Sequence, residues 1–413
     1  MPIASTGDRD RVTDLRRSPP DFFTRELDDA LLEGDIDLAV HSAKDLPDEL
    51  REGLFAAWLP DREDPRDALV LRPGERIEEL PSAPVIGVSS DRRAAWCARR
   101  FPRARLRSIR GNIEERLEQL DSGKYDAVVM AVAVLRRLGL ADRITLPIPL
   151  EELPVPEMQG VLAVTFRADD PATAFLRDRF PLTGCRVLLT GSPALREKGI
   201  DAVLRYGGRP VVFPLIEPVR RPTPLPEGPF DRVLVTSPSA ARLLAACAPG
   251  EIPPAPIVAC GPGTAEALAA AGLDPLFVPE KAFGGAGLLE SIAEWSRPGM
   301  RILRLRSDRA GPDLAEALRA RGLEVTDFVF YETRPRDPGP LPLFDAAVFC
   351  SASAAEVFLE RWGVKALAGK TVVAIGNPTA RRLIETGAEP LTAEEPILAS
   401  AVARLATCRP GSA

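Results

Sequence analysis

The sequence predicts an α/β protein with largely parallel sheets. Short apolar runs alternate with amphipathic stretches along nearly the whole chain, as in "IDLAVHS", "APVIGVSS" and "YDAVVMAVAVLRRLG". Such alternation is typical of strand–helix–strand units, which place consecutive strands side by side in parallel. With 413 residues the chain is too long for a single hydrophobic core, so we expect several domains.

The composition narrows the class of protein. Apolar residues make up 45% of the chain and charged residues 27%, as in soluble globular proteins. The net charge of −6 argues against nucleic-acid binding by bulk charge, and no apolar run is long enough to span a membrane. The start, "MPIASTGDRDRV", lacks the apolar core of a secretion signal, so we expect a cytoplasmic protein. Six scattered cysteines and one histidine predict reduced thiols and no metal site.

The second half of the chain contains an internal repeat. "FDRVLVTSPSAARLL" matches "FDAAVFCSASAAEVF", and "ACGPGTAEALAAAGLDP" matches "AIGNPTARRLIETGAEP". The first pair holds Ser237 and Ser351, and the second pair holds Thr264 and Thr379. The carboxyl ends of parallel strands carry ligand sites, so we expect two lobes facing each other across a cleft. Helix N-capping is the alternative role for these residues, and we expect it to explain at least half of them.

Two arginine clusters mark the first half. "GVSSDRRAAW" places Ser90, Arg92 and Arg93 where a strand ends and a helix begins, and "SIRGNIEERL" places Arg110 and Arg116 in the same way. Helix N-termini and guanidinium groups both bind anions. The clusters therefore predict a ligand with several carboxylates, and solvated arginines on helix caps are the alternative.

A possible catalytic carboxylate lies in "HSAKDLP". Asp45 follows an apolar run and precedes Leu-Pro. This place suits either a catalytic residue at a strand end or a common turn residue, and the local pattern leaves both open.

The motifs of the first half resemble those of porphobilinogen deaminases (hydroxymethylbilane synthases). "VHSAKDLP", "EDPRDAL", "GVSSDRR", "RSIRGNIEERL" and "QGVLAVTFR" occur in that family's order, within residues 1–182. The resemblance implies a two-lobed fold like that of periplasmic binding proteins, which links porphobilinogen units into a linear tetrapyrrole. It implies that Asp45 is the catalytic carboxylate, which transfers protons and holds the pyrrole nitrogens. The substrate-binding residues that we predict in this half are Arg25, Ser90, Arg92, Arg93, Arg110 and Arg116.

Two parts of that family have no counterpart in the sequence. These are the N-terminal strand and helix, and the third domain with the cysteine that anchors the dipyrromethane cofactor. Gly184-Cys185 looks like the anchor site, but "CRVLLTG" predicts a buried strand. We therefore expect no dipyrromethane cofactor and no independent deaminase activity. The alternatives are a non-catalytic module that binds or docks the bilane, and a fragment of a longer bifunctional protein that starts upstream of Met1.

Residues 183–413 resemble uroporphyrinogen-III synthase. The resemblance depends on "VLVTSPSAARLL", "ACGPGTAEAL", "FVFYETRP" and "AIGNPTARRLIETG" together with the repeat. It implies one lobe from residues 183–215 and 336–410, a second lobe from residues 222–330, and mainly parallel sheets in both.

The reaction of this second family closes hydroxymethylbilane into uroporphyrinogen III with loss of water, without metal or organic cofactor. The resemblance implies that Tyr331 donates a proton to the leaving hydroxyl. The substrate-binding residues that it implies are Ser237, Thr264, Arg304, Ser351 and Thr379. The whole chain is thus predicted to be a tetrapyrrole-pathway fusion whose partner is a polycarboxylate tetrapyrrole, with tethering that raises the local concentration of the second enzyme.

Overall fold

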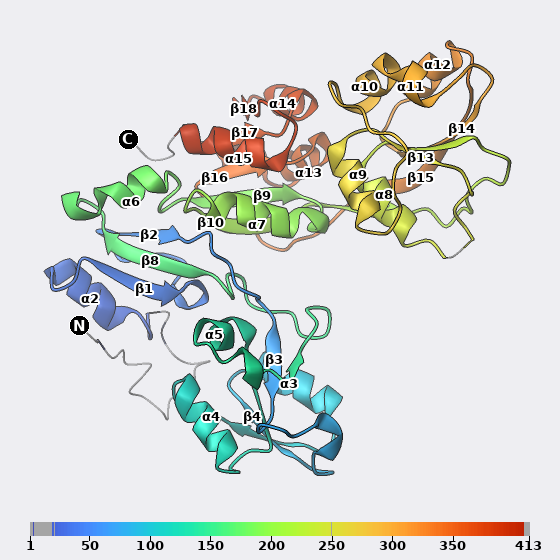
Figure 1. Cartoon of the computed structure of the whole chain (residues 1–413). Helices are drawn as coiled ribbons and strands as arrows, with labels where there is room; N and C mark the ends of the chain where they lie inside the picture. Colours follow the sequence, from blue (N-terminus) through green and yellow to red (C-terminus); the bar gives the residue numbers. More distant parts are fainter. Residues whose placement is uncertain (1–2, 4–18, 20, 249, 409–413) are drawn as a thin grey trace.

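The computed structural model describes residues 3, 19, 21–248 and 250–408 (Figure 1). This part of the chain contains four β-sheets with helices packed around them, so the α/β class is confirmed. Two sheets come from the N-terminal half of the chain and two from the C-terminal half. The first residues of the chain, in which we expected no secretion signal, lie largely outside the described part. None of the helices in the described part has the length and apolar character to cross a lipid bilayer.

The first sheet has three strands in the order β1-β8-β2, and both pairings are antiparallel. Its strands are β1 (Leu38–Ser42), β2 (Leu54–Trp58) and β8 (Leu162–Arg167), and helices α2 (Arg25–Glu33) and α6 (Ala174–Arg179) pack against it. The run "IDLAVHS" predicted a buried strand, but β1 is an edge strand with Leu38 and Val40 exposed by 44% and 56%. A short 3-10 turn, Ala43–Asp45, follows β1 directly.

The second sheet has five strands in the order β5-β4-β6-β3-β7. Strand β4 is parallel to both of its neighbours, whereas β3 is antiparallel to β6 and β7. Its strands are β3 (Asp67–Val70), β4 (Val85–Val88), β5 (Arg105–Ser108), β6 (Ala127–Ala131) and β7 (Leu146–Pro147), and its helices are α3 (Asp91–Arg100), α4 (Ile113–Asp121) and α5 (Val132–Arg137). The N-terminal half therefore has one antiparallel sheet and one mixed sheet, where largely parallel sheets were predicted.

The third sheet is parallel, in the order β10-β9-β16-β17-β18. Its strands are β9 (Arg186–Gly191), β10 (Arg209–Pro214), β16 (Ala346–Phe349), β17 (Thr371–Ala374) and β18 (Leu391–Thr392). Its helices are α7 (Arg196–Leu204), α13 (Ala352–Trp362), α14 (Asn377–Ile384) and α15 (Leu398–Thr407).

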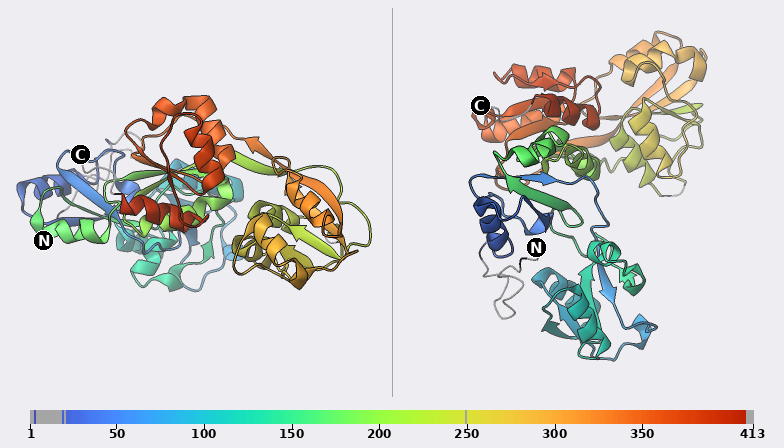
Figure 2. Two further views of the ribbon diagram at one scale, coloured as in Figure 1. Left: turned by 90° about the horizontal axis from the view of Figure 1, so that it is seen from above. Right: turned by 60° about the vertical axis from the view of Figure 1, so that its left-hand side comes forward.

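The fourth sheet has the order β11-β15-β14-β12-β13 and is parallel except for β11. Its strands are β11 (Ile216–Arg220), β12 (Arg232–Val235), β13 (Ile257–Ala259), β14 (Arg301–Ser307) and β15 (Glu324–Pro335). Its helices are α8 (Pro238–Ala245), α9 (Pro262–Ala269), α10 (Gly284–Glu290), α11 (Ile292–Trp295) and α12 (Asp313–Arg319). The antiparallel pair β11–β15 carries the chain between the third and fourth sheets, which Figure 2 shows as two extended segments joining two lobes. The two copies of the repeat fold alike, as β12-α8-β13-α9 and β16-α13-β17-α14.

Asp28 on α2 is a buried carboxyl group whose ionisation costs folding free energy. It is 2% exposed, and desolvation raises its pKa to about 6, although the charge of Arg51 opposes the rise. Because the folded state then binds the proton more tightly than the unfolded state, wild-type stability recovers as the pH falls from about 6 to about 4. We therefore expect Asp28→Asn to increase the free energy of unfolding by about 3 kcal/mol near pH 7.5, and this gain to vanish near pH 4.

Urea unfolding of both proteins at about pH 7.5, 6 and 4.5, followed by circular dichroism, measures this difference. Asp29→Asn is a matched control on the same helix, since Asp29 is partly exposed and pairs with the exposed Arg51. The control should change stability by less than about 1 kcal/mol. A gain for Asp28→Asn that is the same at all three pH values would contradict the role of ionisation.

Candidate functional site

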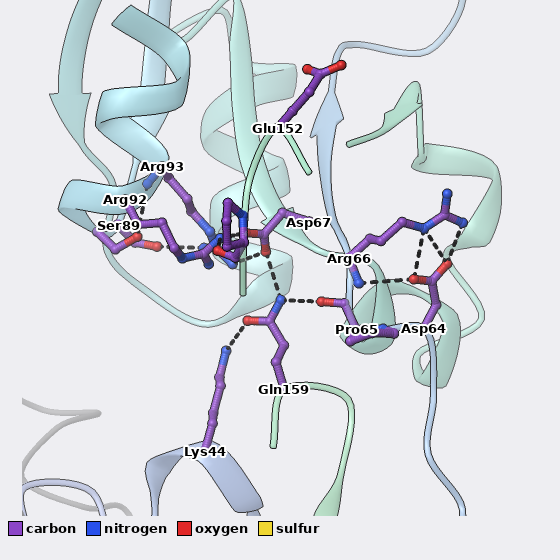
Figure 3. Close-up of polar contacts among 12 residues, drawn as sticks. Lys44, Asp64, Pro65, Arg66, Asp67, Ser89, Arg92, Arg93, Glu152 and Gln159 are labelled. Atoms are coloured by element: carbon purple, nitrogen blue, oxygen red, sulfur yellow. Dashed lines mark hydrogen bonds and ion pairs between the residues drawn. The ribbon is translucent and has the colours of Figure 1, made fainter. Parts of the chain in front are cut away.

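A buried carboxylate, Asp67, organises the arginines of the N-terminal half (Figure 3). It opens β3 and is fully buried. Arg93 Nη2 donates to Asp67 Oδ1 at 2.7 Å, and Arg92 Nη1 lies 2.6 Å from Oδ2 in an ion pair. Desolvation favours the protonated carboxyl, but the two guanidinium groups outweigh it and hold the pKa of Asp67 below its usual range. An ionised carboxylate therefore fixes both predicted ligand-binding arginines.

The same carboxylate is connected to the turn that carries Asp45. Gln159 is buried and donates from Nε2 to Asp67 Oδ1 at 3.1 Å and to the Pro65 carbonyl at 2.6 Å. Lys44 Nζ donates in turn to Gln159 Oε1 at 3.3 Å. This chain of contacts runs from the turn after β1 to the start of β3, and so it ties the first sheet to the second (Figure 3).

Asp45 lies at the end of the 3-10 turn, next to Lys44, with its side chain exposed. Enough protein surrounds it that desolvation raises its pKa, while the Lys44 charge opposes the rise. A carboxyl group with a raised pKa exchanges protons more readily near neutral pH. His41, in contrast, is buried, and its Nε2 lies 2.8 Å from Thr165 Oγ1. Desolvation lowers the pKa of His41 to about 4, so it packs as a neutral ring.

The other predicted arginines gather near Arg93. Ser90 caps α3 by accepting from the Arg93 backbone N–H at 3.4 Å. Arg116 Nε donates to the Gly111 carbonyl at 2.7 Å. Desolvation, together with the charges of Arg93 and Arg110, lowers the pKa of Arg116 to about 10. These guanidinium groups repel one another, and a polycarboxylate bound between them would relieve that repulsion.

Arg25 lies apart from this group. It is exposed on α2 and makes a two-fold hydrogen bond with Asp21, at 2.7 and 2.9 Å. Within the described part of the chain, its hydrogen bonds and ion pair reach Asp21 and connect it neither to Asp67 nor to the turn of Asp45.

The C-terminal half holds a cavity of about 1090 Å³, lined by residues of both its sheets and their helices. Tyr331 on β15 lies in its wall and is 7% exposed. The Tyr331 hydroxyl is 3.0 Å from Ser237 Oγ. Desolvation raises the pKa of Tyr331, and the hydrogen bond with Ser237 reduces the rise. The phenol therefore stays protonated at neutral pH and can donate into the cavity.

The two predicted serines both begin helices. Ser237 Oγ accepts from the Ala240 N–H at 3.0 Å, and Ser351 Oγ accepts from the Ala354 N–H at 3.1 Å, so both are helix N-caps. Of these two, Ser351 also lines the cavity, while Ser237 holds the Tyr331 hydroxyl.

The two threonines are buried in the first turns of helices α9 and α14 rather than in the cavity wall. Thr264 is 2% exposed and Thr379 is 3% exposed. Thr264 Oγ1 lies 3.3 Å from the Cys260 sulfur, and neither threonine lines the cavity.

Arg304 is engaged elsewhere. It is 4% exposed and donates from Nη1 to Asp327 Oδ1 at 3.0 Å, and Arg306 Nε donates to Asp327 Oδ2 at 2.8 Å. Neither arginine lines the cavity. The cations that do are Lys198, Arg205, Arg242 and Arg309. Of these four, only Arg242 lies in a motif that the sequence analysis quotes, "VLVTSPSAARLL". No local pattern shows that helices α7 and α8 and the turn after β14 bring the four cations to one cavity.

Comparison with known proteins assigns each half. Residues 1–174 match the family model "Porphobilinogen deaminase, dipyromethane cofactor binding domain", and residues 200–403 match "Uroporphyrinogen-III synthase HemD". The porphobilinogen deaminase of Phenylobacterium zucineum is 46% identical over 173 residues, which are 41% of this chain and 53% of the relative. That of Chromobacterium violaceum is 46% identical over 149 residues, or 36% of this chain and 48% of the relative. The chain thus spans about half the length of the curated relatives that it matches.

Two solved uroporphyrinogen-III synthases are similar to the C-terminal half. The Helicobacter pylori enzyme is 21% identical with a TM-score of 0.38, and covers 54% of this chain and 100% of its own. A mutant Thermus thermophilus enzyme is 24% identical with a TM-score of 0.35, over 54% of this chain and 98% of its own. The two family models confirm the predicted fusion: the chain joins a segment of the porphobilinogen deaminase family, residues 1–174, to a segment of the uroporphyrinogen-III synthase family, residues 200–403.

Proposed function

We propose that the C-terminal half closes hydroxymethylbilane to uroporphyrinogen III with loss of water. The observation that carries this proposal is Tyr331, a protonated phenol held by Ser237 in the wall of a cavity of about 1090 Å³. A cavity of this size suits a ligand larger than a typical drug molecule. The segment also belongs to the family named for this reaction.

The proposed step begins at the terminal hydroxyl of the bilane. The lone pair of the adjoining pyrrole nitrogen delocalises toward the hydroxymethyl carbon as the C–O bond breaks. The departing hydroxyl takes the Tyr331 proton and leaves as water. The resulting cation is attacked by the substituted α-carbon of the last pyrrole, which gives a spiro intermediate. The bond from that carbon to its original bridging methylene then breaks, and the freed methylene bonds to the other α-carbon of the same pyrrole, which inverts the ring. The ring finally loses a proton, which returns the phenolate to the phenol.

The cavity cations would hold the carboxylates of the bilane. Lys198 on α7 pairs with Glu266 on α9 at 2.6 Å, and Arg309 pairs with Glu356 on α13. Both ion pairs connect the third sheet's lobe with the fourth sheet's lobe. Desolvation lowers the pKa of Arg242, while Glu266 opposes the change. Substrate carboxylates that replace Glu266 and Glu356 would keep the lobes bridged around the ligand.

For the N-terminal half we propose binding of the polycarboxylate tetrapyrrole without independent turnover. The exposed Asp45 and the mutually repelling arginines suit the pyrrole nitrogens and carboxylates of such a ligand. They would suit the same groups of a dipyrromethane cofactor, but covalent attachment needs an accessible thiolate. Cys97 and Cys185 are buried, and desolvation raises the pKa of each to about 12. Neither thiol fits the attachment of that cofactor.

We also propose the boundary between the halves at residues 182 and 183, with lobes of 183–215 plus 336–410 and of 222–330. Leu182 and Cys185 are both buried in one cluster with the third sheet, so the core of the C-terminal half begins at about this point of the chain. The six cysteines are free, which favours a reducing compartment such as the cytoplasm.

The proposal is tested by incubating the purified full chain with hydroxymethylbilane and separating the product isomers by chromatography. We expect isomer III to dominate, whereas buffer alone gives the spontaneous isomer I. An isomer ratio equal to that in buffer would refute the cyclisation activity. A separate incubation with porphobilinogen tests the N-terminal half, and consumption by the purified chain would show that this half turns over on its own.

A further inference from the structure

Helix α7 (Arg196–Leu204) presents opposite faces to the two halves of the chain. Lys198 and Ala202 on the helix, with Arg205 directly after it, line the cavity. Ile200 and Leu204 are 2% and 0% exposed. Residues four apart share one face of a helix, so the pair Ile200 and Leu204 points away from the cavity side.

The buried face of α7 packs against the N-terminal half. Ile200 and Leu204 belong to one hydrophobic cluster with Leu46, Trp58 and other residues of the first sheet and its turns. The cluster also contains Ala43, so residues on both sides of Lys44 and Asp45 take part in it. Figure 1 shows α7 between the first sheet and the third sheet.

Hydrogen bonds and an ion pair fix this packing. The backbone N–H of Trp58 donates to the carbonyl of Gly207, just after α7, at 3.1 Å. The Gly184 N–H donates to the carbonyl of Ala56 on β2 at 2.9 Å. Arg209 Nη2 donates to Asp48 Oδ1 at 2.6 Å. The contact between the halves therefore combines a dry apolar centre with polar contacts around it, as stable protein interfaces do.

We infer that the N-terminal half is a scaffold for the cavity of the C-terminal half. By burying Ile200 and Leu204, it holds α7 in place and with it the cavity cations Lys198 and Arg205. This gives the deaminase-like half a part in cyclisation that needs no turnover of its own. The expected effect on the kinetics of cyclisation rests on the proposed function. The positioning of α7 can be measured whether or not that function is correct.

The test compares Leu46→Ala with Leu117→Ala in the full chain. Both leucines lie in the N-terminal half and are buried, at 8% and 5% exposure, but Leu117 belongs to a cluster of the second sheet. Hydrogen–deuterium exchange of the α7 amides and steady-state cyclisation are measured for both variants. We expect Leu46→Ala to accelerate α7 exchange about tenfold and to raise KM for hydroxymethylbilane severalfold with little change in kcat. Leu117→Ala should leave both quantities near the wild-type values.

Unchanged α7 exchange in Leu46→Ala, or equal acceleration in both variants, would overturn the inference. If Leu46→Ala does not fold, Leu46→Val should show the same local effect at a smaller size. A wild-type chain that forms no isomer III would refute the proposed function alone, because α7 exchange would still report whether the first half positions this helix.

Discussion

Tyr331→Phe should lower kcat for the formation of isomer III by about 100-fold, with little change in KM or in the unfolding temperature. The substitution removes the hydroxyl that would protonate the leaving group, and a positioned general acid contributes about 10²–10⁴-fold to a rate. The ring stays in its buried place beside Phe330, so folding should be unaffected. Steady-state assays of the product isomers and a thermal melt measure the two quantities.

Tyr125→Phe is the matched control for this prediction. Tyr125 is equally buried, and its hydroxyl donates to the Ser108 carbonyl at 2.8 Å in the N-terminal half. It should keep the wild-type kcat. Because burial raises the pKa of Tyr331, the rate should also not fall between about pH 7 and 9 through loss of the phenol proton. Wild-type kcat in Tyr331→Phe would remove this residue from the mechanism.

Asp67→Asn should destabilise the N-terminal half by about 3–5 kcal/mol at neutral pH, the usual cost of removing one partner of a buried ion pair. The buried Arg93 guanidinium and that of Arg92 lose the carboxylate between them. The pKa of Asp67 is lowered in the folded state, so its contribution is present above the unfolded value of 3.8 and is lost as the pH falls through the lower folded value. Variant and wild type should therefore converge only in acid below about pH 4.

Urea unfolding with hydrogen–deuterium exchange at β3 and α3 measures this loss and locates it. Asp21→Asn is the control, because Asp21 makes an exposed ion pair with Arg25 at 2.7 Å. It should cost less than about 1 kcal/mol. If both variants lose the same small amount, then Asp67 does not hold the arginine cluster together.

The sequence reveals the fusion and several helix starts because these depend on local order. Ser237 and Ser351 follow apolar runs and precede helix-forming residues, and both cap helices as capping chemistry predicts. Asp67 and Gln159 lie in the quoted motifs "EDPRDAL" and "QGVLAVTFR", but no local pattern shows what they contact. Arg93 meets Asp67, and Gln159 meets both Lys44 and Asp67, only in the folded chain.

The hydrophobic pattern along the sequence also does not predict whether paired strands run parallel or antiparallel. Strand β8 pairs antiparallel with β1 and β2, which precede it by more than a hundred residues, so the hydrophobic pattern of each strand says nothing of its partner. The cavity cations share this difficulty. Lys198 and Arg309 come from different lobes and face one space only because β11 and β15 bring those lobes together.

The same β11–β15 ribbon has a mechanical consequence. Tyr331 pairs with Arg220 across this ribbon and with Ser307 on β14, beside an irregularity in the pairing. If the lobes rotate apart about the ribbon to admit a long substrate, each atom moves in proportion to its distance from the pivot. The cations Lys198 and Arg242, which lie on α7 and α8 outside the ribbon, then move farther than the phenol of Tyr331, which lies on the ribbon itself. This layout allows the entrance of the cavity to widen while Tyr331, the proposed proton donor, keeps its alignment.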